Sequence, residues 1–239
     1  MIKVIKLKNI LICLGAFALI AAVTLSGVAI RTVSLNNVVT PNGKTIVLDA
    51  GHGGRDGGVS GPNGLRESEI NLNIALATQN LLQKKGYNVV MTRTTSDGLY
   101  NHNDQNKKQA DMSRRRQIIN DAAPDLVISI HQNSFHSSSV RGPRVFYAKG
   151  SVAGKASANH IQTTLNKALN HNAPAAAGDY FILEKTQYQS ILIECGFLTN
   201  PSEAALLATH EHQQRLGQII FLAIHSLLSN QPPQDVELD

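Results

Sequence analysis

The sequence predicts an α/β fold, a single three-layer domain with a mostly parallel sheet flanked by helices, after one N-terminal transmembrane helix. Three observations support this prediction. Short apolar runs rich in β-branched residues alternate with longer amphipathic stretches, which is typical of parallel sheets with helical crossovers. A nearly continuous apolar run of membrane-spanning length stands near the N-terminus. The length of 239 residues suffices for one sizeable domain with appendages but not for a second full domain.

The N-terminal apolar run covers residues 10–30. About 20 residues at 1.5 Å each match a bilayer core of about 30 Å. Three lysines precede the run and a single arginine follows it, so the positive-inside bias places the body of the protein on the extracytoplasmic side of the membrane. The same features fit a secretory signal peptide that is cleaved near residues 27–29, which would leave the protein secreted. The length of the run favours a retained anchor.

The chain divides into a signal anchor or signal peptide (1–31), a polar tether (32–43), a folded domain (44–230) and a flexible tail (231–239). The first 43 residues contain four basic and no acidic residues, so they carry four of the five formal positive charges and the rest of the chain is nearly neutral. A nucleic-acid partner is excluded, because it needs a basic face on the folded domain. The one dense basic run there, residues 114–116, is typical of a solvated helix face.

The folded domain opens with a strand and a glycine-rich loop. Residues 45–48 are a continuous aliphatic run, and the sequence DAGHGG that follows places His52 among glycines. Ligands of open α/β sheets bind beyond the carboxyl ends of the strands, which makes His52 a candidate site residue. A loop that only turns a corner fits this stretch alone equally well. A nucleotide-binding loop is excluded, because the spacing is not GxGxxG and no Lys-Ser/Thr pair follows.

A helix is expected after this loop, since apolar residues recur at spacings of four, three and four at Ile70, Ile74, Ala77 and Leu81. Ser68 is the expected N-cap and Gly86 the expected stop. Glu67 therefore stands immediately before the helix, at its N-terminal end.

The remaining elements alternate in the same way. Apolar runs predict strands over residues 87–92, 126–130, 144–148 and 190–193, and periodicity predicts helices over residues 112–122, 157–169, from 201 onward and over 214–228, with loops over 93–111 and 170–178. His131 and Glu194 each follow a predicted strand, so both are expected at the sheet edge that carries His52. Cys195 lies in an apolar run and is expected to be a small buried residue without a disulfide partner.

This sheet edge collects two imidazoles and two carboxylates, those of His52, Glu67, His131 and Glu194. Two histidines and one carboxylate with an open fourth position are the ligand set of a catalytic zinc site. A further carboxylate outside the ligand set can then carry protons between water and a leaving group. Each histidine taken singly also fits a hydrogen-bonded core residue.

Four ordered stretches, DAGHGGRDGG, GLRESEINLNIA, SRRRQIINDAAPDLVISIHQN and ILIECGFLTNPSEAALL, resemble the motifs of the zinc-dependent N-acetylmuramoyl-L-alanine amidases, the amidase type 3 family. The resemblance spans residues 45–228. It implies that His52, Glu67 and His131 bind Zn²⁺ and that Glu194 is catalytic, with Glu69 as a competing carboxylate. Ser190 and Cys195 depart from the family, which often has Pro and more often Thr or Ser at these positions.

The resemblance also implies the reaction, hydrolysis of the amide between the lactyl group of N-acetylmuramic acid and L-Ala in peptidoglycan. The short chain with one membrane segment and no wall-binding repeats looks most like the amidases of spore germination, which implies a role in muramic-lactam formation in the spore cortex. An inactive, membrane-tethered peptidoglycan-binding scaffold and another zinc peptidase of the wall are the alternatives.

Three arginines, Arg66, Arg115 and Arg144, are candidates for binding the carboxylates of the peptide stem, with surface solubility as the alternative for each. Asp49, three residues before His52, is a candidate hydrogen-bond partner for a ligand imidazole or else a turn cap. The interval between His131 and Glu194 has one clear helix, so no helix that plugs the site is expected. An accessory protein for loading or holding the metal is a possible partner.

Overall fold

The computed structural model describes residues 43–232. In this range no helix is both long and apolar enough to cross a bilayer. The predicted membrane segment and tether up to residue 42, and the tail from residue 233, lie outside the described residues.

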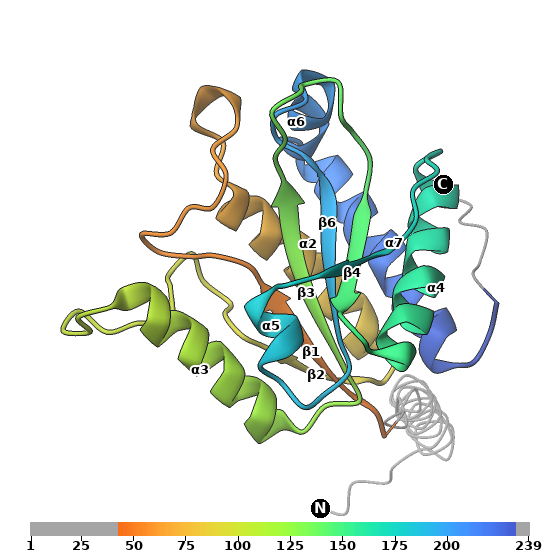
Figure 1. Ribbon diagram of the computed structural model, residues 1–239, viewed down its shortest axis with the longest axis horizontal. Coiled ribbons are helices and arrows are strands. Elements are labelled where there is room, and N and C mark those ends of the chain that lie inside the picture. The colour runs from red at the N-terminus through yellow and green to blue at the C-terminus, as the bar shows by residue number, and fades with distance from the viewer. Residues whose placement is uncertain (1–42, 233–239) are drawn as a thin grey trace, which may run out of the picture. The chain divides into compact units, whose positions relative to one another are not determined.

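The centre of the described domain is a six-stranded sheet in the order β2-β1-β3-β6-β4-β5 (Figure 1). The first four of these strands are parallel, β4 runs antiparallel to β6, and β5 is parallel to β4. The reversal at β4 has a simple cause, since residues 134–143 between β3 and β4 are too few for a crossover helix. The strands are β1 (Thr45–Ala50), β2 (Asn88–Met91), β3 (Leu126–Asn133), β4 (Arg144–Ala148), β5 (Ala176–Gly178) and β6 (Ser190–Phe197).

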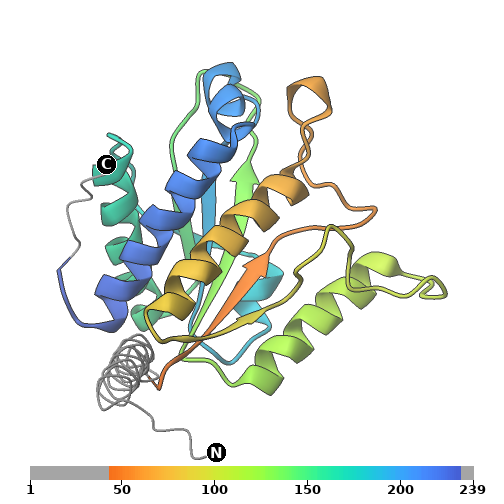
Figure 2. The ribbon, with the colours of Figure 1, turned by 180° about the vertical axis from the view of Figure 1, so that it is seen from behind.

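Helices cover both faces of the sheet, which confirms the predicted three layers (Figures 1 and 2). Strand β1 shows how the layers form: Ile46 and Leu48 pack into the larger core cluster, with α2, α4 and α7, whereas Val47 packs into the smaller one, with α3 and α5. The helices are α2 (Glu67–Lys84), α3 (Lys107–Ala122), α4 (Val152–Ala168), α5 (Phe181–Glu184), α6 (Pro201–Leu207) and α7 (His210–Leu228), with a 3₁₀ turn at Pro62–Gly64.

Helix α2 starts two residues earlier than the predicted N-cap implies. Its N-cap is Arg66, not Ser68, and Glu67 is the first residue of the helix. The N–H groups of Glu67 and Ser68 donate to the carbonyls of Val59 and Gly57 at 3.1 and 3.0 Å. The glycine loop therefore supplies the acceptors that a capping side chain supplies elsewhere.

Helix α3 starts five residues earlier than predicted, at Lys107. The side chain of Asn106 caps it by accepting a hydrogen bond from the N–H of Gln109 at 3.0 Å. The first turn is polar, so apolar periodicity could not reveal it.

Helices α4 and α7 also start earlier than predicted, at Val152 instead of 157 and at His210 instead of 214. Residues 176–178, predicted as loop, form β5. Strands β3 and β6 continue through His131 and Glu194, which are paired in register.

Candidate metal centre

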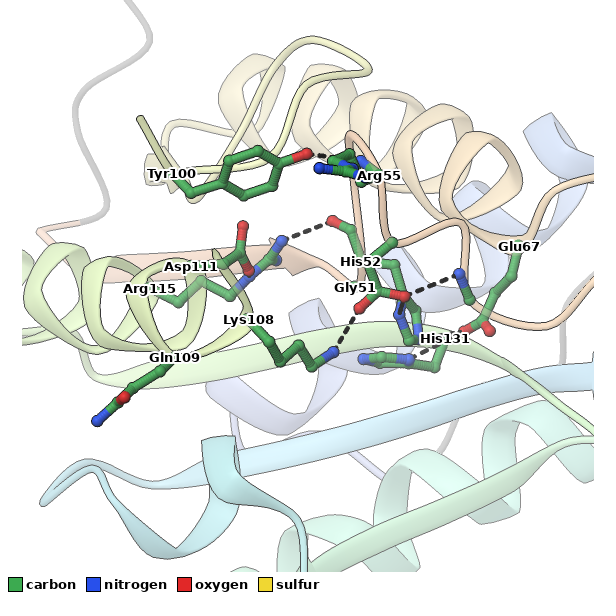
Figure 3. A network of polar contacts seen from close by, with 12 residues as sticks. Gly51, His52, Arg55, Glu67, Tyr100, Lys108, Gln109, Asp111, Arg115 and His131 are labelled. Carbon is green, nitrogen blue, oxygen red and sulfur yellow. Dashed lines mark hydrogen bonds and ion pairs between the residues drawn. The ribbon is translucent and has the colours of Figure 1, made fainter. Parts of the chain in front are cut away.

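Three side chains from separate elements converge at the carboxyl edge of the sheet. His52 follows β1, Glu67 opens α2, and His131 lies near the end of β3. Their ligand atoms all lie within 4.8 Å of one another. Oε1 of Glu67 is 2.9 Å from Nδ1 of His131 and 3.3 Å from Nε2 of His52 (Figure 3). The structure thus brings together the three predicted metal ligands.

The carboxylate of Glu67 is held in place from several sides. Its Oε2 accepts the N–H of Val59 at 2.7 Å, and its Oε1 accepts the N–H of Gln132 at 3.1 Å and the side-chain amide of Asn71 at 3.2 Å. Burial alone would raise the pKa of Glu67, but hydrogen bonds to His131 and His52 hold it well below its usual range. Glu67 is therefore an ionised, oriented acceptor.

Glycine is required beside this carboxylate at Gly58. The residue has a φ of +68°, and a Cβ atom there would lie 2.4 Å from Oε2 of Glu67 and 2.8 Å from Cδ2 of His52. A side chain at this position would displace two of the three converging groups. The glycines of the loop thus make room for the site as well as turning the chain.

The other ring nitrogen of His52 faces a carboxylate that the sequence analysis did not select. Nδ1 of His52 lies 2.9 Å from Oδ1 of Asp56, close enough for an ion pair although not aligned as a hydrogen bond. Asp49, a candidate either for an imidazole partner or for a turn cap, instead accepts hydrogen bonds from Thr92, Ser129 and Arg115. Both His52 and Asp56 lie in the glycine-rich loop, which is not helical, so their spacing of four residues did not predict the contact.

Glu194 lies across the same cavity, in β6 and in register with His131. Its side chain is buried, and Oε2 has no hydrogen-bond partner among the described residues. Burial raises the pKa of Glu194 to about 7, and the negative charge of Glu67 adds to this while the two histidines oppose it. A free carboxyl oxygen that titrates near neutrality suits a group that accepts and returns a proton.

The cavity has a volume of about 590 Å³ and extends from the metal-ligand cluster to α5. Tyr180, Phe181 and Ile182 line it opposite the histidines without filling it. Between His131 and Glu194 the chain forms β4, α4, β5 and the four-residue α5. This interval therefore contains two helices where one was expected, and the second of them, α5, lines the cavity.

The donor set fits a zinc ion. Two imidazole nitrogens and one carboxylate oxygen approach a common point, and imidazole and carboxylate are ligands that Zn²⁺ prefers. The buried thiol of Cys195 does not belong to the group, and it packs into the larger core cluster as predicted. The structure contains a three-ligand arrangement with an adjoining cavity, which is the form of catalytic rather than structural zinc sites.

Arg115, predicted to bind substrate, is buried beside the cavity. Its side chain is 1% exposed, and its guanidinium makes four hydrogen bonds, to Asp111, Asp49 and the carbonyls of Ala50 and His52. Four of the five N–H donors of the guanidinium are thus bonded within the protein, and a role in binding substrate stays a prediction for Arg115. The run at residues 114–116, expected to be a solvated face, is buried at its middle residue.

Arg66 and Arg144 lie in different settings. Nη2 of Arg66 donates to the carbonyl of Gly54 at 2.7 Å and so braces the glycine loop. Arg144 is paired with Glu194 across the antiparallel strands β4 and β6, so the two side chains project from the same face of the sheet. A role in substrate binding remains a prediction for both.

Two further polar residues support the site without having been selected from the sequence. Asn71 bonds to Glu67 and to the carbonyl of Gly51, and its position four residues after Glu67 on one helix face was an available signal. Arg93, expected in a surface loop, is buried and donates to the carbonyls of Ala50, Gly51 and Ser68. Nothing in its local sequence distinguishes it from a solvated arginine.

Comparison with known proteins places this arrangement in a family. Residues 46–226 match the family model described as N-acetylmuramoyl-L-alanine amidase. The chain belongs to this amidase family. The amidase is 33% identical over 188 residues to the germination-specific N-acetylmuramoyl-L-alanine amidase of Bacillus subtilis (strain 168), with 77% of this chain and 79% of the relative covered. The predicted resemblance is confirmed.

Two further relatives set the amidase in context. It superimposes with a TM-score of 0.75 and 32% identity on the CwlD amidase from Clostridioides difficile, solved in complex with the GerS lipoprotein, over 79% of this chain and 100% of that one. It is also 32% identical over 181 residues to the probable cell wall amidase LytH of Staphylococcus aureus, covering 74% of this chain and 56% of that protein. The enzyme is thus an N-acetylmuramoyl-L-alanine amidase of peptidoglycan.

Proposed function

We propose that this amidase depends on Zn²⁺ held by His52, Glu67 and His131, and that Glu194 carries the proton in the cleavage of the amide between the lactyl group of N-acetylmuramic acid and L-Ala. The observation that carries the proposal is the convergence of the three ligand atoms within 4.8 Å beside a cavity that also contains the unpartnered carboxyl of Glu194.

The metal and the surrounding residues have separate roles in the proposed reaction. Zinc bound at this site supplies a Lewis acid that polarises the scissile carbonyl and lowers the pKa of water. Glu194 accepts a proton from the attacking water and returns it to the nitrogen of L-Ala as the C–N bond breaks. The ionised Glu67 would balance part of the charge of the metal, and Phe181 and Ile182 form part of the cavity wall.

We further propose that the enzyme acts in the spore cortex, in muramic-lactam formation and germination, on the extracytoplasmic side of the membrane. The similarity to the germination-specific amidase of Bacillus subtilis supports the physiological stage. The apolar segment at residues 10–30 and its flanking charges support the location, either as a membrane anchor or as a cleaved signal. The lipoprotein complex of the Clostridioides difficile relative supports an accessory protein as partner.

Metal removal tests the catalytic proposal. The chain from residue 32 onward is incubated with purified cell wall before chelation, after chelation, and after re-addition of zinc, and the products are identified by mass. We expect peptides that begin with L-Ala, lost with the chelator and restored by zinc. Retained activity in the fully chelated enzyme would refute the zinc dependence.

The same products separate the alternatives. A different zinc peptidase of the wall would release fragments cut within the peptide stem and leave the lactyl amide intact. A peptidoglycan-binding scaffold would bind zinc and wall but release nothing, and addition of a candidate accessory protein would leave that result unchanged.

A further inference from the structure

We infer that helix α3 holds the ligand His52 from two sides, at its backbone through Arg115 and at its ring through Lys108 and Asp56, and that this hold sets the affinity of the site for zinc. The inference rests on the zinc site proposed above. It gives a function to two basic residues of α3 that do not themselves reach the ligand cluster.

The backbone of His52 has a conformation that must be held by its surroundings. Its φ is 62°, in the left-handed region that residues with a side chain rarely adopt. Nη2 of Arg115 donates to the carbonyl of His52 at 2.5 Å, and Nη1 donates to the carbonyl of Ala50 at 2.8 Å (Figure 3). One guanidinium therefore binds the carbonyls on both sides of Gly51, where the chain turns out of β1.

Arg115 is itself oriented by two carboxylates. Nε donates to Oδ2 of Asp111 at 2.6 Å, and Nη1 donates to Oδ1 of Asp49 at 2.6 Å. Asp111 stands one helical turn before Arg115 on the same face of α3, and Asp49 lies in β1. The planar guanidinium is thus locked between helix and strand, so its two contacts with the loop have a defined direction.

The second contact is made two turns earlier on α3. Lys108 forms an ion pair with Oδ2 of Asp56, and Oδ1 of Asp56 lies 2.9 Å from Nδ1 of His52. A carboxylate at Nδ1 favours the tautomer in which Nε2 carries the lone pair, and Nε2 is the nitrogen that faces Glu67, at 3.3 Å. Asp56 thereby favours, through its charge at 2.9 Å from Nδ1, the ring nitrogen that is available to a metal, and Lys108 forms the ion pair that positions Asp56.

Lys108 makes this arrangement testable without disturbing the core. Its side chain is 61% exposed, whereas that of Arg115 is buried. An ordinary surface ion pair contributes little to stability, so loss of Lys108 should leave the thermal midpoint nearly unchanged. A change in zinc affinity at constant stability would then report only on how His52 is positioned.

The experiment measures zinc dissociation constants of purified full-length variants by competition with a chromophoric chelator, together with the thermal midpoint of each metal-free protein. We expect Asp56→Ala to raise the dissociation constant about 10- to 100-fold, the range seen when such partners of ligand histidines are removed. Lys108→Met should raise it less and Lys108→Arg should restore it. Arg116→Met is the control, an exposed residue of the same helix with the same change of charge.

Arg115→Lys tests the backbone contact, because lysine keeps the charge between the two aspartates but cannot bind both loop carbonyls. It should also raise the dissociation constant at least 10-fold. Values for Asp56→Ala and Lys108→Met within twofold of the unaltered protein would overturn the inference, whether or not Arg115→Lys folds. Failure of the unaltered protein to bind zinc at all would instead refute the proposed metal site.

Discussion

Gly51 leaves the space in which the ring of His131 lies. A Cβ atom at position 51 would be 2.2 Å from Cε1 and 2.3 Å from Nε2 of that ring, far inside van der Waals contact. The loop after β1 and the end of β3 are thus fitted to each other at the metal centre. The φ of Gly51 is not in the left-handed region, so the requirement for glycine here is one of space.

Gly51→Ala is therefore expected to fold but to displace His131. The predicted result is a zinc dissociation constant raised at least 10-fold, together with a matching loss of amidase activity at limiting zinc. Gly61→Ala is the control, because a Cβ atom there would come no closer than 3.3 Å to its neighbours. Equal zinc affinity in both variants would show that the ring of His131 can move at no cost.

Removal of the Glu194 carboxyl tests its role as proton carrier. Glu194→Gln is expected to lower kcat by about 10²- to 10⁴-fold, the usual contribution of a general acid or base, while zinc stays bound at one ion per chain. Turnover of a muramoyl peptide and metal content are the two measurements. Glu69→Gln serves as control, because Glu69 is the exposed carboxylate two residues from Glu67. Full turnover in Glu194→Gln would exclude the role.

The pH dependence of catalysis follows from the pKa of Glu194, which burial raises to about 7. The carboxylate form accepts the proton from water, so kcat/KM is expected to rise with pH and to level off above about pH 7. The positive charge of bound zinc lowers the pKa of Glu194, so the rise in kcat/KM will lie at lower pH in the zinc enzyme. A rate profile of the zinc enzyme between pH 4 and 9 measures it, and an activity that falls with rising pH across that range would contradict the assignment.

The raised pKa of Glu194 also affects stability, which is expected to fall as the pH rises. The pKa of Glu194 is higher in the folded protein than its ordinary value of 4.5, so the folded state binds this proton more tightly than the unfolded state. Its contribution to stability is complete below about pH 4.5 and is lost as the pH rises through about 7. Glu194→Gln should therefore stabilise the metal-free protein more at pH 8 than at pH 5, by an amount on the order of 3 kcal/mol.

Urea unfolding of both proteins at the two pH values measures this difference. A stabilisation by Glu194→Gln that is the same at pH 5 and pH 8 would mean that the carboxyl ionises without penalty in the folded protein. The measurement is independent of catalysis, since it uses protein without metal.

Arg144 is a candidate for recognition of the peptide stem near the reacting bond, because it lies opposite Glu194 in the sheet. Arg144→Ala is expected to raise KM about 10-fold for a muramoyl peptide with free stem carboxylates, with kcat little changed, since it removes binding common to the ground and transition states. Amidation of those carboxylates should abolish the difference. Arg141→Ala, in the loop before β4, is the control, and an effect equal to that of Arg144→Ala would indicate a general loss of positive charge.

Much of the site follows from local sequence, because the carboxyl ends of parallel strands meet at one edge. His52, His131 and Glu194 each stand at or just beyond an aliphatic run, and the strands that carry them are neighbours in the sheet. Glu67 is placed by the start of an amphipathic helix. These positions depend on the periodicity of short segments, which is legible without knowledge of distant contacts.

The pairing of the charged residues around the ligands was decided only by the tertiary structure. Residues 114–116 are three consecutive arginines, yet Arg115 alone is buried, since successive residues of a helix point about 100° apart and only one of the three meets β1. Its partner Asp49 is 66 residues away, and Lys108 and Asp56 are 52 apart. Hydrophobic pattern determines which segments form the sheet and its layers, whereas the partner of a buried charge depends on which surfaces the packed layers bring together.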